Sequence, residues 1–155
     1  MAIAPNTTFV SGAVLTAAQQ NAFGFGVVAL SPVTTSTTTS GSVEQTRTSV
    51  TWTALANRYY KITWFEGAVT NGTNASVNNM YLRATTTTGT VIGNVEIYYG
   101  SASMEQGAVC SCVKTFAAGT QTVYARVLSN AATNTTYFGS ATTPAYLLVE
   151  DIGPA

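Results

Sequence analysis

The chain contains no histidine, and only 8% of its 155 residues are charged, six basic and six acidic. Histidine is the side chain that most often transfers protons and binds metals near neutral pH. Its absence removes the commonest means of both kinds of chemistry. No phosphate-binding loop, serine-nucleophile elbow or metalloprotease motif replaces it. The sequence therefore predicts a protein that is not an enzyme and binds no cofactor or metal.

Carboxylates offer one alternative, because a glycosidase needs two of them roughly 5 to 9 Å apart. Glu66 and Glu96 come near strand ends and are the candidates for such a pair. Against this, Glu66 precedes Gly67 and Glu105 is followed closely by Gly107, which is typical of solvated turns. Catalysis therefore stays a minor alternative.

Net charge and long apolar runs are also lacking. The formal net charge is zero, so the chain lacks the excess of positive charge that is typical of nucleic-acid-binding proteins. No run reaches the ~18 to 20 apolar residues of a membrane span. The first basic residue is Arg47, so the N-terminus lacks the positive start of a secretory signal. We expect no nucleic-acid partner and no membrane partner.

Cysteine is limited to Cys110 and Cys112. On a strand, residues two apart point to the same face about 6.5 to 7 Å apart, at the limit of what a disulfide spans. A zinc site would need two more cysteine or histidine ligands, which the chain does not have. We predict two free thiols packed on one face of a strand, which is how free cysteine usually behaves.

Threonine is the commonest residue, and it occurs in runs that alternate with apolar side chains. Such alternation is typical of half-buried β-strands. Eight strand-like runs separated by turn residues lie at 50–54, 59–65, 80–84, 91–99, 109–116, 121–128, 137–138 and 145–150. This spacing predicts an all-β fold, an antiparallel β-sandwich of the jelly-roll kind. Alternation places Trp52 and Trp64 on the core face with Val50 and Ile62.

The chain divides into three parts. Residues 1–30 read as an N-terminal attachment arm, in which 16–23 predict one short helix with Thr16 and Gln19 as its capping box. Residues 31–41 are a Thr/Ser-rich stretch that reads as a solvated connector or as an edge strand, with the connector favoured. Residues 42–155 form the sandwich body. The apolar arm residues expected to make contacts are Phe9, Val10, Val14, Leu15, Phe23 and Phe25.

Aromatic side chains exceed what one sandwich interior can hold. Alternation places six of them outside, as an oligomer or ligand face: Tyr59, Phe65, Tyr81, Tyr98, Tyr124 and Tyr146. A neutral, charge-poor surface of this kind is typical of protein–protein contacts. A sugar-stacking platform is the alternative use of the aromatics, drawn from Trp52, Trp64, Tyr59, Tyr60, Tyr98 and Tyr99.

Two stretches carry a resemblance to a known family. The opening from Phe9 to Phe23, with its Leu-Thr-Ala-Ala-Gln-Gln-Asn core, and the ending Ala-Tyr-Leu-Leu-Val-Glu-Asp-Ile-Gly-Pro resemble small β-rich virion proteins of tailed bacteriophages. The middle strands Tyr-Tyr-Lys-Ile-Thr and Thr-Val-Tyr-Ala-Arg-Val are similar to the same family. The resemblance implies a jelly-roll domain, commonly trimeric, that is assembled in the host cytoplasm and attached to a capsid or tail.

Within that resemblance, the preferred role is a homotrimeric capsid decoration (cement) protein whose arm contacts the major capsid protein. A minor tail or tail-tip protein, plugged into a tail hub protein and presented to the host, is the alternative. A carbohydrate-binding module that recognises a host surface glycan is the third reading, from a different class. Copy number per particle separates the first two readings, and sugar binding by a monomer would identify the third.

Overall fold

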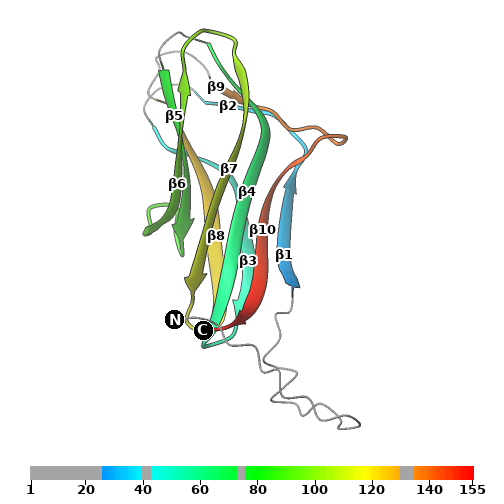
Figure 1. Cartoon of the computed structure of the whole chain (residues 1–155), viewed down its shortest axis with the longest axis vertical. Coiled ribbons are helices and arrows are strands. Elements are labelled where there is room, and N and C mark those ends of the chain that lie inside the picture. The colour runs from blue at the N-terminus through cyan, green and yellow to red at the C-terminus, as the bar shows by residue number, and fades with distance from the viewer. Residues whose placement is uncertain (1–25, 40–42, 73–75, 130–134) are drawn as a thin grey trace, which may run out of the picture.

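The computed structural model describes residues 26–39, 43–72, 76–129 and 135–155, which fold into two packed antiparallel sheets (Figure 1). The strands are β1 (Gly26–Val33), β2 (Thr37–Thr39), β3 (Gln45–Ala54), β4 (Arg58–Asn71), β5 (Ser76–Ala84), β6 (Val91–Tyr99), β7 (Glu105–Thr115), β8 (Gly119–Ser129), β9 (Thr135–Tyr137) and β10 (Ala145–Pro154). Within these ranges no helix is long and apolar enough to cross a membrane.

The eight long strands are connected as a jelly roll. Sheet A consists of β1, β10, β4 and β7 in that order, with the short pair β9 and β2 continuing it beside the far end of β4. Sheet B has the order β3-β8-β5-β6. The pairs β1–β10, β3–β8, β4–β7 and β5–β6 nest inside one another along the chain, which is the jelly-roll arrangement. The predicted all-β sandwich is confirmed.

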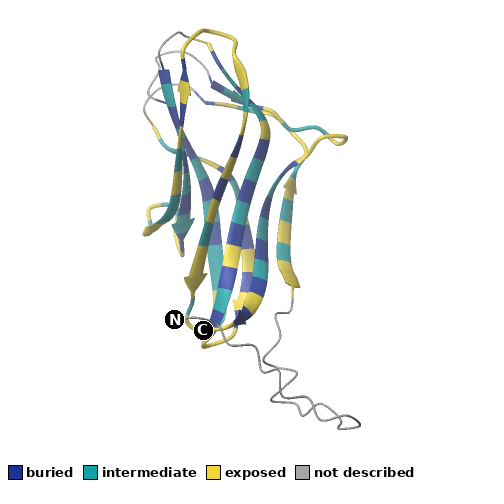
Figure 2. Ribbon diagram, in the orientation of Figure 1, coloured by how far each residue is buried: buried dark blue, intermediate teal, exposed yellow. Residues whose placement is uncertain are grey.

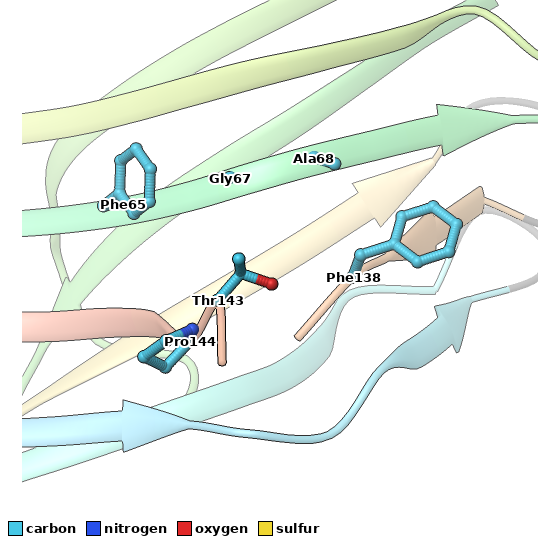
Figure 3. Close-up of a pocket in the computed structure, with 6 residues that line it drawn as sticks. All are labelled: Phe65, Gly67, Ala68, Phe138, Thr143 and Pro144. Carbon is cyan, nitrogen blue, oxygen red and sulfur yellow. The ribbon is translucent and has the colours of Figure 1, made fainter. Parts of the chain in front are cut away.

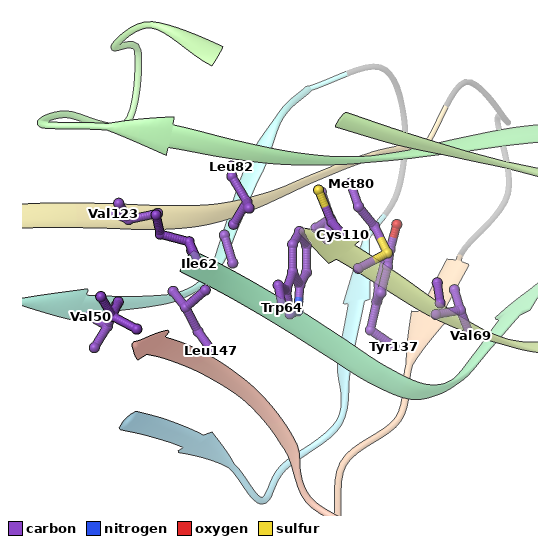
Figure 4. Packing of buried hydrophobic residues seen from close by; sticks show 14 of the residues in the cluster. Val50, Ile62, Trp64, Val69, Met80, Leu82, Cys110, Val123, Tyr137 and Leu147 are labelled. Carbon is purple, nitrogen blue, oxygen red and sulfur yellow. The ribbon is translucent and has the colours of Figure 1, made fainter. Parts of the chain in front are cut away.

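Strand alternation builds the core between the sheets. Along β5 and β10 buried and half-buried residues alternate almost without interruption, which produces the stripes in Figure 2. Trp64 is 0% exposed and Trp52 is 5% exposed, so their predicted core position is confirmed. Trp52 packs edge-on against Phe116 with ring centroids 5.0 Å apart. Figure 4 shows Trp64 among the side chains of both sheets.

The first strand differs from the predicted division of the chain. Residues 26–30, assigned to the arm, and 31–33, assigned to the connector, together form β1, which pairs with β10 from Gly26 to Val33. Thr37–Thr39 form β2, so here the edge-strand alternative is the correct one. The physical reason is that the free backbone edge of β10 supplies hydrogen bonds that need no strong side-chain pattern. The predicted helix at 16–23 and all six arm residues lie outside the described residues.

A cluster of neutral polar side chains fills the core at the end of the sandwich near β2 and β9. Thr135 Oγ1 lies 3.0 Å from both Asn78 Oδ1 and Ser129 Oγ, and all three residues are 0% exposed. Asn78 Nδ2 and the hydroxyl of Tyr137 have no hydrogen-bond partner among the described residues. Internal water usually occupies such positions, because an unpaired buried polar group is costly.

Candidate functional site

The outer face of sheet A carries apolar side chains on all four of its long strands, interrupted by Thr63, Ser111 and the ion pair of Lys61 with Glu150. We call it the apolar face, and its members are Val109 and Val113 of β7, Tyr59 and Phe65 of β4, Tyr146, Leu148 and Ile152 of β10, and Leu30 and Pro32 of β1. Val113 and Leu30 are each 56% exposed, and Val109 is 51% exposed. Exposed apolar side chains gathered on one face of a protein usually mark an interaction site.

Local sequence explains why this face is apolar. In β10 the run from Ala145 to Val149 is apolar at every position, so both the inward and the outward side chains are hydrophobic. In β7, Cys110 points to the core while Val109 and Val113 point outward. Continuous apolar runs are typical of strands that are covered on both faces. In the isolated chain the described residues cover the inner side alone.

Two contacts between side chains lie on the apolar face. Lys61 and Glu150 form an ion pair at 3.4 Å, with the lysine side chain 46% exposed. An exposed pair of this kind adds little stability. Phe65 stacks on Tyr146, with ring centroids 5.2 Å apart and ring planes 25° apart. The stacked rings lie on directly paired positions of β4 and β10.

A pocket of about 390 Å³ lies at the end of the apolar face, beside the Phe65 ring. Its lining residues are Phe65, Gly67, Ala68, Phe138, Thr143 and Pro144. A bulge in β4 between Glu66 and Val69 places Gly67 and Ala68 out of the regular ladder. Figure 3 shows Phe65 and Phe138 at opposite ends of the pocket, with Thr143 and Pro144 between them. The lining is mainly apolar and contains no ionisable side chain.

The wall formed by Phe138, Thr143 and Pro144 is held close to the strand that begins sheet A. A Cβ on Gly139 would lie 2.6 Å from the carbonyl oxygen of Val33, so this position requires glycine. The neighbouring hydroxyl of Ser140 lies 2.8 Å from that of Thr143. These contacts place the loop between β9 and β10 over the bulge of β4.

Arg47 forms a buried polar network next to the bulge of β4. Its guanidinium donates to Glu66 Oε1 at 2.9 Å, to the carbonyl of Thr35 at 2.8 Å and to Thr37 Oγ1 at 2.7 Å. Trp64 Nε1 also donates to Glu66 Oε1, at 2.9 Å. The side chains of Arg47 and Glu66 are both 0% exposed. This network ties β3 and the β1–β2 connection to the bulged part of β4.

The predicted solvated turn at Glu66 is wrong. Glu66 lies inside β4 and faces the core. Burial raises its pKa, although the hydrogen bond and charge of Arg47 and the hydrogen bond from Trp64 oppose that shift. Glu96, its predicted catalytic companion, is an exposed residue of β6 in sheet B. The structure does not bring the two carboxylates together, because one lies inside the sandwich and the other on its surface.

A second buried ion pair joins Arg58 to Asp151, with Nε and Oδ2 2.5 Å apart. Asp151 Oδ1 also accepts a hydrogen bond from the backbone amide of Gly153 at 3.0 Å. The pair links the first residue of β4 to the end of β10. We assign both buried pairs a structural role, since their charges are already satisfied within the protein.

The six outward aromatics do not form one face. Tyr59, Phe65 and Tyr146 belong to sheet A, whereas the other three, Tyr81, Tyr98 and Tyr124, belong to sheet B. The two sets therefore lie on opposite sides of the sandwich. Sequence alternation separates inward from outward positions, but it does not say which sheet a strand joins.

The outer face of sheet B is polar around its tyrosines. Thr51 and Thr122 hydroxyls lie 2.9 Å apart across β3 and β8. Arg83 Nε lies 2.9 Å from Glu44 Oε1, and the Arg83 guanidinium lies over the Tyr81 ring at 5.5 Å. Arg126 also approaches Glu44, at 3.7 Å. Arg83 and Arg126 therefore share Glu44 on this face.

The sugar-stacking platform considered from the sequence is not assembled. Four of its six members are core residues with at most 5% exposure: Trp52, Trp64, Tyr60 and Tyr99. The remaining two, Tyr59 and Tyr98, lie on different sheets. The residues that sequence reasoning missed are Val109, Val113, Leu30, Phe138 and Pro144. The outward valines of β7 were the available signal, because they alternate with the two cysteines.

Both cysteines are free, as predicted; Cys110 is buried and Cys112 is partly exposed. Burial raises the pKa of the Cys110 thiol to about 12; Cys112 raises it further by a smaller amount, and a backbone hydrogen bond with Leu82 opposes the shift. In the part of the chain that the structure describes, no group of three or more His, Cys, Asp or Glu side chains could hold a metal ion.

No known family model matches the chain, and no curated protein matches it. Among solved structures, the EclA C-terminal domain, a sugar-binding protein, is 14% identical with a TM-score of 0.40, over 75% of this chain and 76% of that chain. Eiger TNF from S. frugiperda is 8% identical with a TM-score of 0.48, over 84% and 95% of the two chains. CsCBM6-3 from Clostridium stercorarium, in complex with cellobiose, is 13% identical with a TM-score of 0.31, over 81% and 82%. At these scores the likenesses carry no functional argument.

Proposed function

We propose that this chain is a non-catalytic structural subunit that assembles by burying the apolar face of sheet A. The observation that carries the proposal is the contrast between the two outer faces, because solvent-facing valine and leucine side chains are costly unless a partner covers them. The buried ion pairs and the separation of Glu66 from Glu96 agree with a role without catalysis.

The assembly we propose is a homotrimer in the virion of a tailed bacteriophage, as a capsid decoration protein. Closed cyclic symmetry buries an apolar face without producing open fibres. The choice of three copies and of the capsid rests on the sequence resemblance described above. The major capsid protein is then the second partner. A minor tail protein bound to a tail hub would use the same face, and the number of copies per purified particle separates the two roles.

The mass of the full-length chain in solution tests the proposal. Light scattering at micromolar concentration should give three times 16.1 kDa, about 48 kDa. Val113→Glu should shift the mass to that of one chain, because it places a charge in the apolar face. Tyr98→Glu is the matched control, since Tyr98 is 61% exposed on sheet B and should leave the mass unchanged. A mass near 16.1 kDa for the unmodified chain would contradict the proposal.

Carbohydrate binding is the second candidate function, and the pocket beside Phe65 and Phe138 is the observation that favours it. Its volume of about 390 Å³ falls within the range of small-ligand sites. A sugar also needs polar groups to orient its hydroxyls, and Thr143 supplies the only side-chain hydroxyl in the lining. A glycan array compared between the unmodified chain and Phe138→Ala tests this function. Binding that disappears in the variant would support it.

A further inference from the structure

We propose that the pocket beside Phe65 on one copy receives the Phe9 side chain from the segment 1–25 of a neighbouring copy. This inference rests on the proposed function, because it requires copies that associate through the apolar face. It names the occupant of the pocket, which the apolar lining alone does not identify.

Chemical complementarity is the first support. Residues 1–25 contain no Asp, Glu, Lys or Arg, and their largest side chains are Phe9, Phe23 and Phe25. The pocket has no ionisable lining residue and presents the rings of Phe65 and Phe138. An aromatic ring between two aromatic rings gains stacking or edge-on contacts in addition to its burial. An uncharged, phenylalanine-bearing segment therefore matches the pocket in polarity.

Reach then distinguishes Phe9 from the other two phenylalanines. Gly26 pairs with Asp151, whereas the pocket lies near the row in which Tyr146 pairs with Pro32 and Phe65. Five residues of β10 separate these rows, roughly 17 Å. Residues 23 and 25 can lie no more than about 10 Å from Gly26, because only one to three residues separate them from it. Phe9 has about 55 Å of extended chain before Gly26, so it can reach a pocket on a neighbour over a much wider range of arrangements.

By itself the apolar face is small for a stable interface between two copies. Four strands about 4.8 Å apart, each presenting about eight residues of ~3.3 Å, give a face of roughly 500 Å². A stable interface usually buries about 800 Å² on each partner. Exchange of the 1–25 segments supplies additional apolar contact area, whereas a segment folded back on its own sheet would cover the face that the association needs.

Photocrosslinking in the full-length chain tests the inference. Phe9→p-benzoyl-Phe is mixed with an equal amount of ¹⁵N-labelled unmodified chain and irradiated, and the crosslinked peptides are identified by mass spectrometry. We expect position 9 of unlabelled copies to be joined to peptides of labelled copies that contain 65–68 or 138–144. Crosslinks confined to one copy, or directed to other residues, would overturn the inference.

A pair of loop variants sharpens the test. Thr143→Trp places an indole in the pocket and should reduce the crosslink about tenfold, whereas Thr142→Trp should leave it unchanged. The two positions are matched, because both hydroxyls contact Ser140 Oγ and both residues are exposed. Equal crosslinking in the two variants would contradict binding in the pocket. An oligomeric chain whose crosslinks lie elsewhere disproves this inference alone, whereas a monomeric chain disproves the proposed function.

Discussion

Sheets A and B are built from strands of similar length in which inward and outward side chains alternate. Their outer faces nevertheless expose different kinds of side chain. Sheet A presents Val109, Val113 and Leu30 with at least half of their surface exposed. Sheet B presents paired threonines and a network in which Arg83 and Arg126 share Glu44. This difference is the basis of the proposed association through sheet A.

The two core tryptophans have different polar surroundings. Trp64 Nε1 on sheet A donates to Glu66, which also pairs with Arg47 of β3 in sheet B. On sheet B, the indole nitrogen of Trp52 has no partner among the described residues. Trp64 therefore belongs to a polar network that joins the two sheets, whereas Trp52 is held mainly by packing.

The largest expected effect compares the two tryptophans. Trp64→Ala should lower the free energy of unfolding by about 5 kcal/mol and Trp52→Ala by about 3 kcal/mol, because both leave cavities. The Trp64 change also removes a hydrogen bond to a buried carboxylate, which adds to its cost. Urea unfolding followed by circular dichroism measures both values. Equal losses would show that the network around Glu66 adds nothing beyond packing.

Removal of Arg47 tests the network directly. Arg47→Met should cost about 3 to 5 kcal/mol at pH 7, because it leaves a buried carboxylate without its counter-charge. The raised pKa of Glu66 means that the folded state holds this proton more tightly than the unfolded state. Stability associated with the neutral acid is therefore present at low pH and is lost as the pH rises through the pKa of Glu66.

Two controls accompany the Arg47 variant. The loss of stability should be smaller at pH 4 than at pH 7, since a protonated Glu66 needs no counter-charge. The double variant Arg47→Met/Glu66→Gln should recover most of the stability at pH 7. A loss that does not depend on pH, or that the double variant does not reduce, would assign the effect of Arg47 to its other contacts with Thr35 and Thr37.

Alkaline pH should destabilise the sandwich through groups buried near sheet A. Burial raises the pKa of Cys110 from 9.0 and that of Tyr99 from 10.0, in each case to about 12. The folded state keeps these protons while the unfolded state releases them, so the free energy of unfolding should fall as the pH rises from about 9 toward 12. Thermal melts at half-unit pH intervals measure the slope.

Cys110→Ala should flatten this slope between pH 9 and 10, where the thiol of the unfolded chain titrates before the tyrosines. An unchanged slope would exclude Cys110 as the cause.

In the native protein the partly exposed Cys112 should react with iodoacetamide before the buried Cys110. Peptide mapping after brief labelling measures that order.

The smallest expected effects concern the surface charges of the two faces. Glu44→Ala on sheet B should cost about 1 kcal/mol, because Arg83 and Arg126 both lose a partner. Lys61→Ala on sheet A should cost less than about 0.5 kcal/mol, since its ion pair is exposed. Mass measurements on the same variants should show unchanged association for Glu44→Ala. Weaker association of Lys61→Ala would show that this ion pair takes part in the interface.

The alternation of apolar and polar residues predicted much of the fold. Trp52 and Trp64 were predicted in the core, and each of the eight predicted runs overlaps a strand of the sandwich. The first strand was missed because Val27, Val28 and Leu30 show no alternation and follow a glycine-rich stretch. This segment forms a strand because its backbone pairs with β10. Backbone pairing does not require a particular pattern of side chains, so the sequence does not reveal it.

Glu66 shows a second limit. A glutamate before glycine resembles a turn, and its buried position becomes tolerable only because Arg47, nineteen residues away, supplies a matching charge. The pocket also depends on distant partners, since Gly139 must lie against the carbonyl of Val33 before Phe138 and Thr143 can approach the bulge of β4.

By itself the sequence determined which side chains face inward, because alternation along a strand is a local property of the extended backbone. It also determined the scarcity of charge that predicts a protein interface. Tertiary structure alone decided that Tyr59, Phe65 and Tyr146 share one side while Tyr81, Tyr98 and Tyr124 share the other. The physical reason is that the sheet each strand joins is set by pairing between residues far apart in the chain, and the uniform period of two contains no information about that choice.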